Sequence, residues 1–236
     1  MIDHRTERVH AAVRSLPMFR GLPAGDQDQI ERIATLREVR KGEVLWNAGD
    51  EASSLHLIVQ GRVKIVRHGA GGDVILEIFG RGEPVGAVAV YNGIPYPASA
   101  IALEPSTLLI VPAREYLELI ERHPEFARDL IRELTRLYLG LSRKVEDMRG
   151  QRVEVRIANL FLSLAERMGR PRDGALEIPI ALSRQEVADL VGTTVETAIR
   201  VLSRWGREGV LVTGEGRFLV PSPERLRAVA DGTAEE

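Results

Sequence analysis

The feature that most constrains the fold is a pair of short helices that the sequence predicts at residues 183–206. Ser183 followed three residues later by Glu186 is a capping box, in which each side chain satisfies a free backbone amide at a helix start. Gly192 then ends the first helix in a tight turn, and one of the two threonines that follow it can cap the second helix. Two helices joined by a glycine turn predict a helix-turn-helix.

The second helix of this pair has two different faces. The residues of its apolar face are Val195, Ala198, Val201, Leu202 and Trp205. The opposite face offers the polar residues Thr194, Glu196, Thr197, Arg200 and Arg204. The segments 210–212 and 217–220 then predict a β-hairpin, the wing of a winged helix, with Arg217 placed to meet a phosphate. Such an exposed helix face can read base edges, although a helix pair with a glycine turn can also be purely structural.

Residues 19–122 have a different texture, with short apolar runs separated by glycine and other turn residues. These runs are Val44–Trp46, Leu55–Val59, Val63–Val66, Val74–Phe79 and Thr107–Val111. Several short strands with turns between them are typical of a β-sandwich or a β-barrel. The segment therefore predicts an all-β domain of the β-roll or jelly-roll type, with a hairpin tip at Gly69–Gly72.

A long helix begins at Pro124 and is expected to end near Gly150. Apolar residues recur along it at spacings of three, four, three, four and three residues: Ile131, Leu134, Tyr138, Leu141, Val145 and Met148. This heptad pattern predicts a parallel pair of identical helices, and hence a homodimer with two-fold symmetry. The alternative is a single amphipathic helix that covers a sheet, and a second stripe at Ala127, Leu130 and Leu137 predicts contact with the β-domain.

The fold class expected from these segments is α+β, with an N-terminal β-roll, a long dimerisation helix and a C-terminal winged helix-turn-helix. The expected parts are an N-terminal helical segment (1–18), a β-roll sensor domain (19–122), the dimerisation helix (123–150) and the winged helix-turn-helix domain (151–230). An amphipathic helix over residues 153–168 is expected to open the last part.

Composition excludes several kinds of site. The sequence has no cysteine, which removes disulfides, thiolate zinc sites and cysteine-ligated iron–sulfur clusters. No apolar run approaches 18 residues and the N-terminus has no signal-peptide core, so we expect a cytoplasmic protein without a membrane span. The formal net charge of −2 means that any DNA contact must come from a local basic patch.

The motif at 182–205 closely resembles the DNA-binding motif of the CRP/FNR family of transcriptional regulators. The order of β-roll, long helix and winged helix matches this family over roughly residues 16–225, and Gly42, Gly49 and Gly61 fall at its β-roll turns. The resemblance implies a cyclic-nucleotide-binding-like jelly roll and a sequence-specific DNA-binding regulator. It also implies that RNA polymerase is a partner. The two-fold axis of the expected dimer predicts that the operator is an inverted repeat.

The resemblance assigns roles to single residues. Glu196 and Arg200 match the pair that reads bases in the family, because a carboxylate accepts from cytosine and a guanidinium donates to guanine. The Thr194–Thr197 segment with its valine looks FNR-like and favours half-sites resembling TTGA, although Ile199 stands where that branch has serine. The expected DNA-binding residues are Ser183, Arg184, Gln185, Thr194, Val195, Glu196, Thr197, Arg200 and Arg217, the first three as phosphate contacts.

The expected effector pocket departs from the family pattern. Its candidate residues are Gly86, Ala87, Val88, Pro97, Ala98 and Ser99. The family's cyclic-AMP site needs a glutamate where this chain has Ala87, and an Arg-Ser pair where it has Pro97-Ala98. Because a buried phosphate needs a charged partner, we expect an effector that is not cyclic AMP. Without cysteine it is not an iron–sulfur cluster either.

Three alternatives stay open at this point. Haem that senses nitric oxide or carbon monoxide needs an axial ligand, and the histidines available are His4, His10, His56, His68 and His123. Among them His56 is expected at the surface or at a sheet edge, and His10 is the least implausible ligand. Function without a ligand, or with an unidentified apolar ligand, is also compatible with the sequence. A cyclic-nucleotide-binding regulatory subunit is the remaining class; an enzyme or a metal site is not expected.

Overall fold

The computed structural model describes residues 4–69, 72–148 and 151–233. The described residues form two compact units, one within 1–69 and 75–138 and the other within 70–74 and 139–236. No helix among these residues is both long enough and apolar enough to cross a membrane.

The first unit begins with helices and continues as a β-roll. Its helical elements are α1 (His4–Ser15), η1 (Pro17–Phe19), α2 (Ala24–Ile33), α3 (Ala87–Asn92), α4 (Ala113–Arg122) and the first part of α5 (Pro124–Met148). Its strands are β1 (Thr35–Val39), β2 (Val44–Trp46), β3 (Ser54–Gln60), β4 (Val63–Gly69), β5 (Gly72–Phe79), β6 (Pro84–Val85), β7 (Ser99–Ala102) and β8 (Ser106–Pro112).

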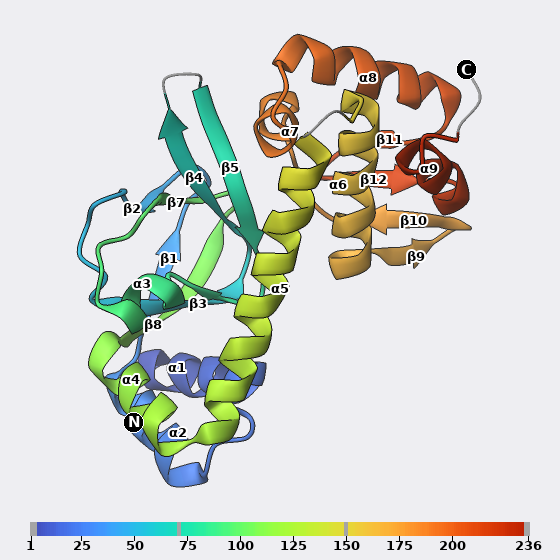
Figure 1. Ribbon diagram of the computed structural model, residues 1–236. Helices are drawn as coiled ribbons and strands as arrows, with labels where there is room; N and C mark the ends of the chain where they lie inside the picture. The colour runs from blue at the N-terminus through green and yellow to red at the C-terminus, as the bar shows by residue number, and fades with distance from the viewer. Residues whose placement is uncertain (1–3, 70–71, 149–150, 234–236) are drawn as a thin grey trace. The chain divides into compact units, whose positions relative to one another are not determined.

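The strands of this unit make two four-stranded sheets, whose orders are β1-β8-β3-β6 and β2-β7-β4-β5. Strands far apart in sequence lie side by side, as β3 and β8 do in antiparallel register (Figure 1). The turn at Gly61 accepts only glycine, for a steric reason. A Cβ on Gly61, which has φ of 88°, would lie 2.7 Å from the Pro105 carbonyl oxygen. The glycine-separated runs of the sequence therefore form the expected β-roll.

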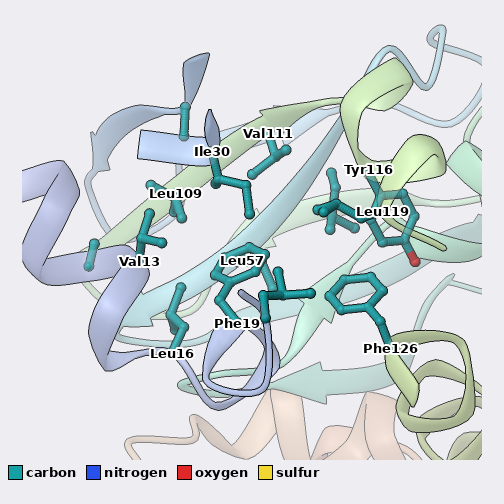
Figure 2. Close-up of a cluster of buried hydrophobic side chains, with 14 of the residues drawn as sticks. Val13, Leu16, Phe19, Ile30, Leu57, Leu109, Val111, Tyr116, Leu119 and Phe126 are labelled. Carbon is teal, nitrogen blue, oxygen red and sulfur yellow. The ribbon is translucent and has the colours of Figure 1, made fainter. Parts of the chain in front are cut away.

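One hydrophobic core lies between the first sheet and the helices that cover it. Figure 2 shows Leu57 and Leu109 of the sheet facing Val13, Phe19 and other helical residues. Phe19 stacks on Phe126 of α5, with ring centroids 6.4 Å apart. The amphipathic helices therefore hold α5 against the β-roll, because their apolar faces are buried in a common core.

A second core lies between the two sheets and corrects the expectation for His56. This histidine was expected at the surface or at a sheet edge because it alternates with leucines, and that expectation was wrong. It is 8 % exposed, because β3 is an interior strand whose two faces are both covered. Its ring packs on Trp46 with centroids 4.8 Å apart, and burial lowers the pKa of His56 to about 4.

The described residues of α5 can be compared with the two stripes expected from its sequence. Leu130 is buried in the core of the first unit, as the second stripe predicts, and Leu134 packs partly against the same core. Ile131 and Tyr138 are 61 % and 68 % exposed. Three further residues of the heptad pattern have side chains outside the described part of the chain, namely Leu141, Val145 and Met148. The exposed stripe therefore has no cover within the described part of this chain.

The second unit combines helices with a small sheet. Its helices are α6 (Val153–Met168), α7 (Arg184–Val191), α8 (Val195–Glu208) and α9 (Pro223–Ala230). Its strands are β9 (Arg170–Arg172), β10 (Ala175–Ile178), β11 (Val212–Gly214) and β12 (Arg217–Val220), in the order β11-β12-β10-β9. Phe161 of α6 packs on Phe218 of β12, with ring centroids 4.7 Å apart, so the helices and the sheet share one core.

The fold class expected from the sequence is confirmed as an N-terminal β-rich domain, a long helix and a C-terminal helix-turn-helix. One boundary differs, because the first strand of the wing begins at Val212. The two preceding residues, Val210 and Leu211, are buried after the end of α8. The division into four parts, 1–18, 19–122, 123–150 and 151–230, stays a prediction.

Candidate nucleic-acid interface and pocket

The helix-turn-helix begins with the capping box that the sequence predicts. The Ser183 hydroxyl accepts a hydrogen bond from the Glu186 backbone N–H, and the Glu186 carboxylate accepts one from the Ser183 N–H. Glu186 is 8 % exposed, so its charge is held by these bonds in a nearly closed environment. The start of α7 is therefore fixed by local contacts.

The turn between the two helices depends on Gly192. This residue has φ of 67°, a left-handed conformation that ends α7 and directs the chain into α8. Arg156 of α6 donates from Nη2 to the Gly192 carbonyl at 3.2 Å. Thr193 donates its N–H to the Ala188 carbonyl at 3.0 Å. The turn is thus tied both to its own helix and to α6, and Arg156 is a supporting residue that sequence reasoning missed.

Helix α8 is positioned by its cap and by its apolar face. Thr194 is the N-cap residue, and its side chain accepts from the Thr197 N–H at 3.3 Å. Four residues of the expected apolar face are buried: Ala198, Val201, Leu202 and Trp205. Val195 is half-buried, so it lies at the edge between the two faces. Burial of this face leaves the opposite side of α8 open to solvent.

The open side of α8 brings together the residues expected to read bases. Glu196 and Arg200 are both exposed, one turn apart, and neither forms an ion pair or a hydrogen bond within the described part of the chain. Ile199 lies beside Arg200 and is 45 % exposed. Among the described residues, this face therefore presents a free carboxylate, a free guanidinium and an exposed apolar side chain.

Three other expected DNA-binding residues have partners inside the protein. Arg184 donates from Nη2 to Thr213 Oγ1 of β11 at 2.9 Å, which joins α7 to the wing. Gln185 donates to Asp189 at 2.7 Å. Arg217 folds over Gly214, with Nη1 3.7 Å from Glu177 Oε1 and a buried Nε that has no hydrogen-bond partner among the described residues. All three residues therefore have contacts within the second unit, and their role at DNA stays a prediction.

The candidate effector residues lie around a cavity of about 150 Å³ in the first unit. Five of the six expected residues line it: Gly86, Ala87, Val88, Pro97 and Ala98. Ser99 is not among the described lining residues, and its hydroxyl accepts from the Ala48 N–H at 3.0 Å. Sequence reasoning missed Trp46, Phe79, Leu130 and Leu134, which come from distant segments and carry no local motif.

Stacked aromatic rings form one wall of the cavity. Trp46 and Tyr96 have ring centroids 4.1 Å apart and ring planes inclined by 17°. A Cβ on Gly86 would lie 2.7 Å from Tyr96 Cε1, and this glycine has φ of 82°. Only glycine therefore allows the backbone to approach the stacked rings this closely.

Two family models match the chain. The model of the cyclic nucleotide-binding domain matches residues 36–123, and the model of the Crp-like helix-turn-helix domain matches residues 155–229. These two models coincide with the β-roll and with the winged helix described above.

The chain belongs to the CRP/FNR family. It is a transcriptional regulator with a helix-turn-helix DNA-binding domain. The Cyclic AMP receptor protein of Thermus thermophilus is 29 % identical over 223 residues, which cover 94 % of this chain and 100 % of that protein. The transcriptional activator protein Anr of Pseudomonas aeruginosa is 29 % identical over 224 residues, which cover 91 % of this chain and 88 % of that protein. These relatives are transcription regulators rather than enzymes.

Solved structures of CRP/FNR-type proteins have the same fold. FixK2 from Bradyrhizobium japonicum has a TM-score of 0.74 at 20 % identity, and the match covers 84 % of this chain and 97 % of that one. A CRP/FNR-family transcriptional regulator from Thermus thermophilus has a TM-score of 0.67 at 22 % identity, covering 84 % of this chain and 100 % of that one.

The described lining of the cavity in this CRP/FNR regulator carries no charged side chain that could pair with a cyclic phosphate. None of the described residues that line it is charged, and Ala87 and Pro97-Ala98 replace the expected carboxylate and Arg-Ser pair. A cyclic phosphate in this place would lose its hydration without gaining a charged partner.

No histidine occurs among the described lining residues either. His10 pairs with Glu31 at 2.8 Å, and His123 pairs with Asp26 at 3.0 Å. The side chain of His4 lies outside the described part of the chain. The haem alternative therefore gains no support from this cavity.

Proposed function

We propose that this regulator binds an inverted-repeat operator with TTGA-like half-sites as a homodimer. The observation that carries the proposal is the pair Glu196 and Arg200, both exposed and unpaired within the described residues, on a helix whose other face is buried. A free guanidinium can donate two hydrogen bonds to O6 and N7 of guanine, and a free carboxylate can accept from N4 of cytosine. Both bases occur in a TTGA half-site and its complement.

The contacts to phosphate come from the start of α7. The first turn of a helix offers backbone N–H groups and a positive dipole end, which favour an anion. Ser183 and Gln185 are exposed there, and Arg184 lies beside them. The bond from Arg184 to Thr213 supports a role in which this arginine orients the wing as well as meeting the DNA backbone.

The homodimer is supported by α5. Ile131, Tyr138 and Leu139 are each at least half exposed, and the first two belong to the heptad pattern. Apolar side chains in such a pattern gain stability when a second identical helix covers them. A parallel pair has the two-fold symmetry that an inverted repeat requires. The side of Leu134 that faces the β-roll is already partly covered, so this residue contributes less to the dimer than the pattern alone implies.

The effector of the proposed regulator is neither cyclic AMP nor an iron–sulfur cluster. An apolar cavity supports the first exclusion, and a sequence without cysteine supports the second. We assign the protein to the cytoplasm, where its DNA partner is found, and we expect RNA polymerase as a second partner.

Fluorescence anisotropy of a labelled duplex tests the proposal. The full-length protein is titrated with a duplex that carries a TTGA inverted repeat, and with a scrambled duplex of the same composition. Arg200→Ala should weaken operator binding by roughly 10- to 100-fold, because a bidentate arginine–guanine contact contributes about 1–3 kcal/mol. Binding to the scrambled duplex should change far less.

The matched control is Arg114→Ala. Arg114 is an exposed arginine of α4 in the other unit, so its removal changes the net charge equally without touching the recognition helix. This variant should bind the operator like the unaltered protein. The role of Arg200 would be disproved if both variants bound the operator equally well.

A further inference from the structure

The cavity beside α3 combines properties that specify a class of ligand. Its lining is made of aliphatic and aromatic residues from strands, from α3, from the loop between α3 and β7, and from α5. Two of these residues carry polar side-chain atoms, and both atoms are already used inside the protein. Trp46 donates from Nε1 to the Ala98 carbonyl at 3.1 Å, and the Tyr96 hydroxyl donates to the Ser54 carbonyl at 2.9 Å.

A charged ligand would therefore lose its hydration in this place and find no charged side chain among the described lining residues. An uncharged apolar ligand has little hydration free energy to lose. Burial of its apolar surface in the cavity is favourable. The chemistry of the lining thus selects against the anionic ligands for which the family model is named.

The volume of the cavity limits the size of the ligand. A cavity of about 150 Å³ that is lined by apolar side chains is large enough for a molecule of the size of benzene. The stacked rings of Trp46 and Tyr96 provide a flat wall against which one more aromatic ring can pack. The backbone at Gly86 lies against Tyr96 without room for a Cβ.

We propose that this cavity binds an uncharged molecule with a single aromatic ring, or an apolar molecule of similar size. Val88 lines the cavity and is 46 % exposed, so it stands where the cavity meets solvent.

Occupancy of the cavity acts directly on α5. Leu130 and Leu134 of this helix line the cavity, while Ile131 and Tyr138 of the same helix are exposed. A ligand that contacts Leu130 and Leu134 changes the packing of α5 on the β-roll. It therefore also changes which face of α5 is available to a second copy of the chain. This link to DNA binding rests on the proposed function, whereas the choice of ligand does not.

Toluene and benzoate are a matched pair of probes, since they share a ring and differ in charge. The full-length protein is titrated with each, and with cyclic AMP, while its Tm and the fluorescence of Trp46 and Trp205 are followed. Toluene at ten times its Kd should raise Tm by about 2 to 5 °C and give a saturable change in fluorescence. Benzoate and cyclic AMP should do neither.

Variants that narrow the cavity locate the binding. Val88→Phe narrows its mouth, and Leu134→Phe narrows it from α5, so each should weaken toluene binding by about 5-fold or more. Val44→Phe is the matched control, because Val44 is 42 % exposed, similar to Val88, and is not among the described lining residues. Toluene binding that persists unchanged in both cavity variants would overturn the proposal, as would binding of benzoate as tight as that of toluene.

Operator binding measured with and without toluene tests the link to α5. The operator Kd should change about 5-fold or more when toluene saturates the cavity. An unchanged Kd would overturn the link while the direct titration still supports the ligand class. A protein that fails to bind the operator under either condition would refute the proposed function, and the toluene titration would decide the cavity independently.

Discussion

Ser183 and Glu186 form reciprocal hydrogen bonds across the first turn of α7. The Ser183 hydroxyl accepts from the Glu186 N–H at 3.1 Å and donates to the Glu186 carboxylate at 3.0 Å, and the Ser183 N–H donates to the same oxygen at 2.9 Å. This contact determines where α7 begins. Since α7 packs against α8, it also affects how the recognition helix is held.

Ser183→Ala should lower the free energy of unfolding of the C-terminal unit by about 1 kcal/mol, the usual loss when an N-cap hydroxyl is removed. Urea denaturation followed by the fluorescence of the buried Trp205 measures this loss. Ser183→Thr keeps the hydroxyl and should lose much less. Equal midpoints for the unaltered protein and for Ser183→Ala would show that the cap contributes nothing.

Ile199 should read a thymine methyl group in the half-site, because it is an exposed apolar side chain next to Arg200 on the recognition face. Replacing one thymine of each half-site by uracil removes only that methyl group. The replacement should weaken binding of the unaltered protein several-fold at one position of the half-site. The same replacement should have little effect on Ile199→Ser, and an identical uracil effect in both proteins would contradict this role.

Ile131→Glu should dissociate the proposed dimer, because it places a charge in an apolar stripe that needs a second copy to cover it. Multi-angle light scattering should give the mass of two chains for the unaltered protein and of one chain for the variant. The affinity for the operator should fall as the dimer is lost. Ile94→Glu is the control, since Ile94 is 45 % exposed and lies outside α5. A dimeric Ile131→Glu protein would place the interface elsewhere.

His56 should make the stability of the first unit depend on pH. Burial lowers the pKa of His56 to about 4 from 6.5, so the unfolded chain binds the extra proton between these values. This contribution is complete above about pH 6.5 and is lost as the pH falls toward 4, by about 3 kcal/mol in total. Denaturation curves at about pH 7 and about pH 4.5 measure it.

His56→Phe keeps a ring against Trp46 but cannot be protonated. The loss of stability between about pH 7 and about pH 4.5 should therefore be smaller in this variant than in the unaltered protein. His68→Gln removes an exposed histidine and should keep the full loss. A parallel pH dependence of the unaltered protein and His56→Phe would show that His56 does not titrate in this range.

Much of the helix-turn-helix could be predicted from the sequence because its signals are local. The capping box, the left-handed Gly192 and the apolar face of α8 each involve residues within a few positions of one another. The contacts of Arg217 could not be predicted from local signals. Its place depends on Glu177, which belongs to another strand and is far away in sequence.

The sequence alone determined the order of the parts, the start of the recognition helix, and the lack of charge around the expected pocket. Helix caps and side-chain periodicity involve residues only a few positions apart, so they can be predicted from one segment at a time. Only the tertiary structure decided that His56 is buried and that Trp46 stacks on Tyr96. It also decided that α5 closes the cavity with Leu130 and Leu134. These relations join segments many residues apart, and they arise from the packing of two sheets and a helix into common cores.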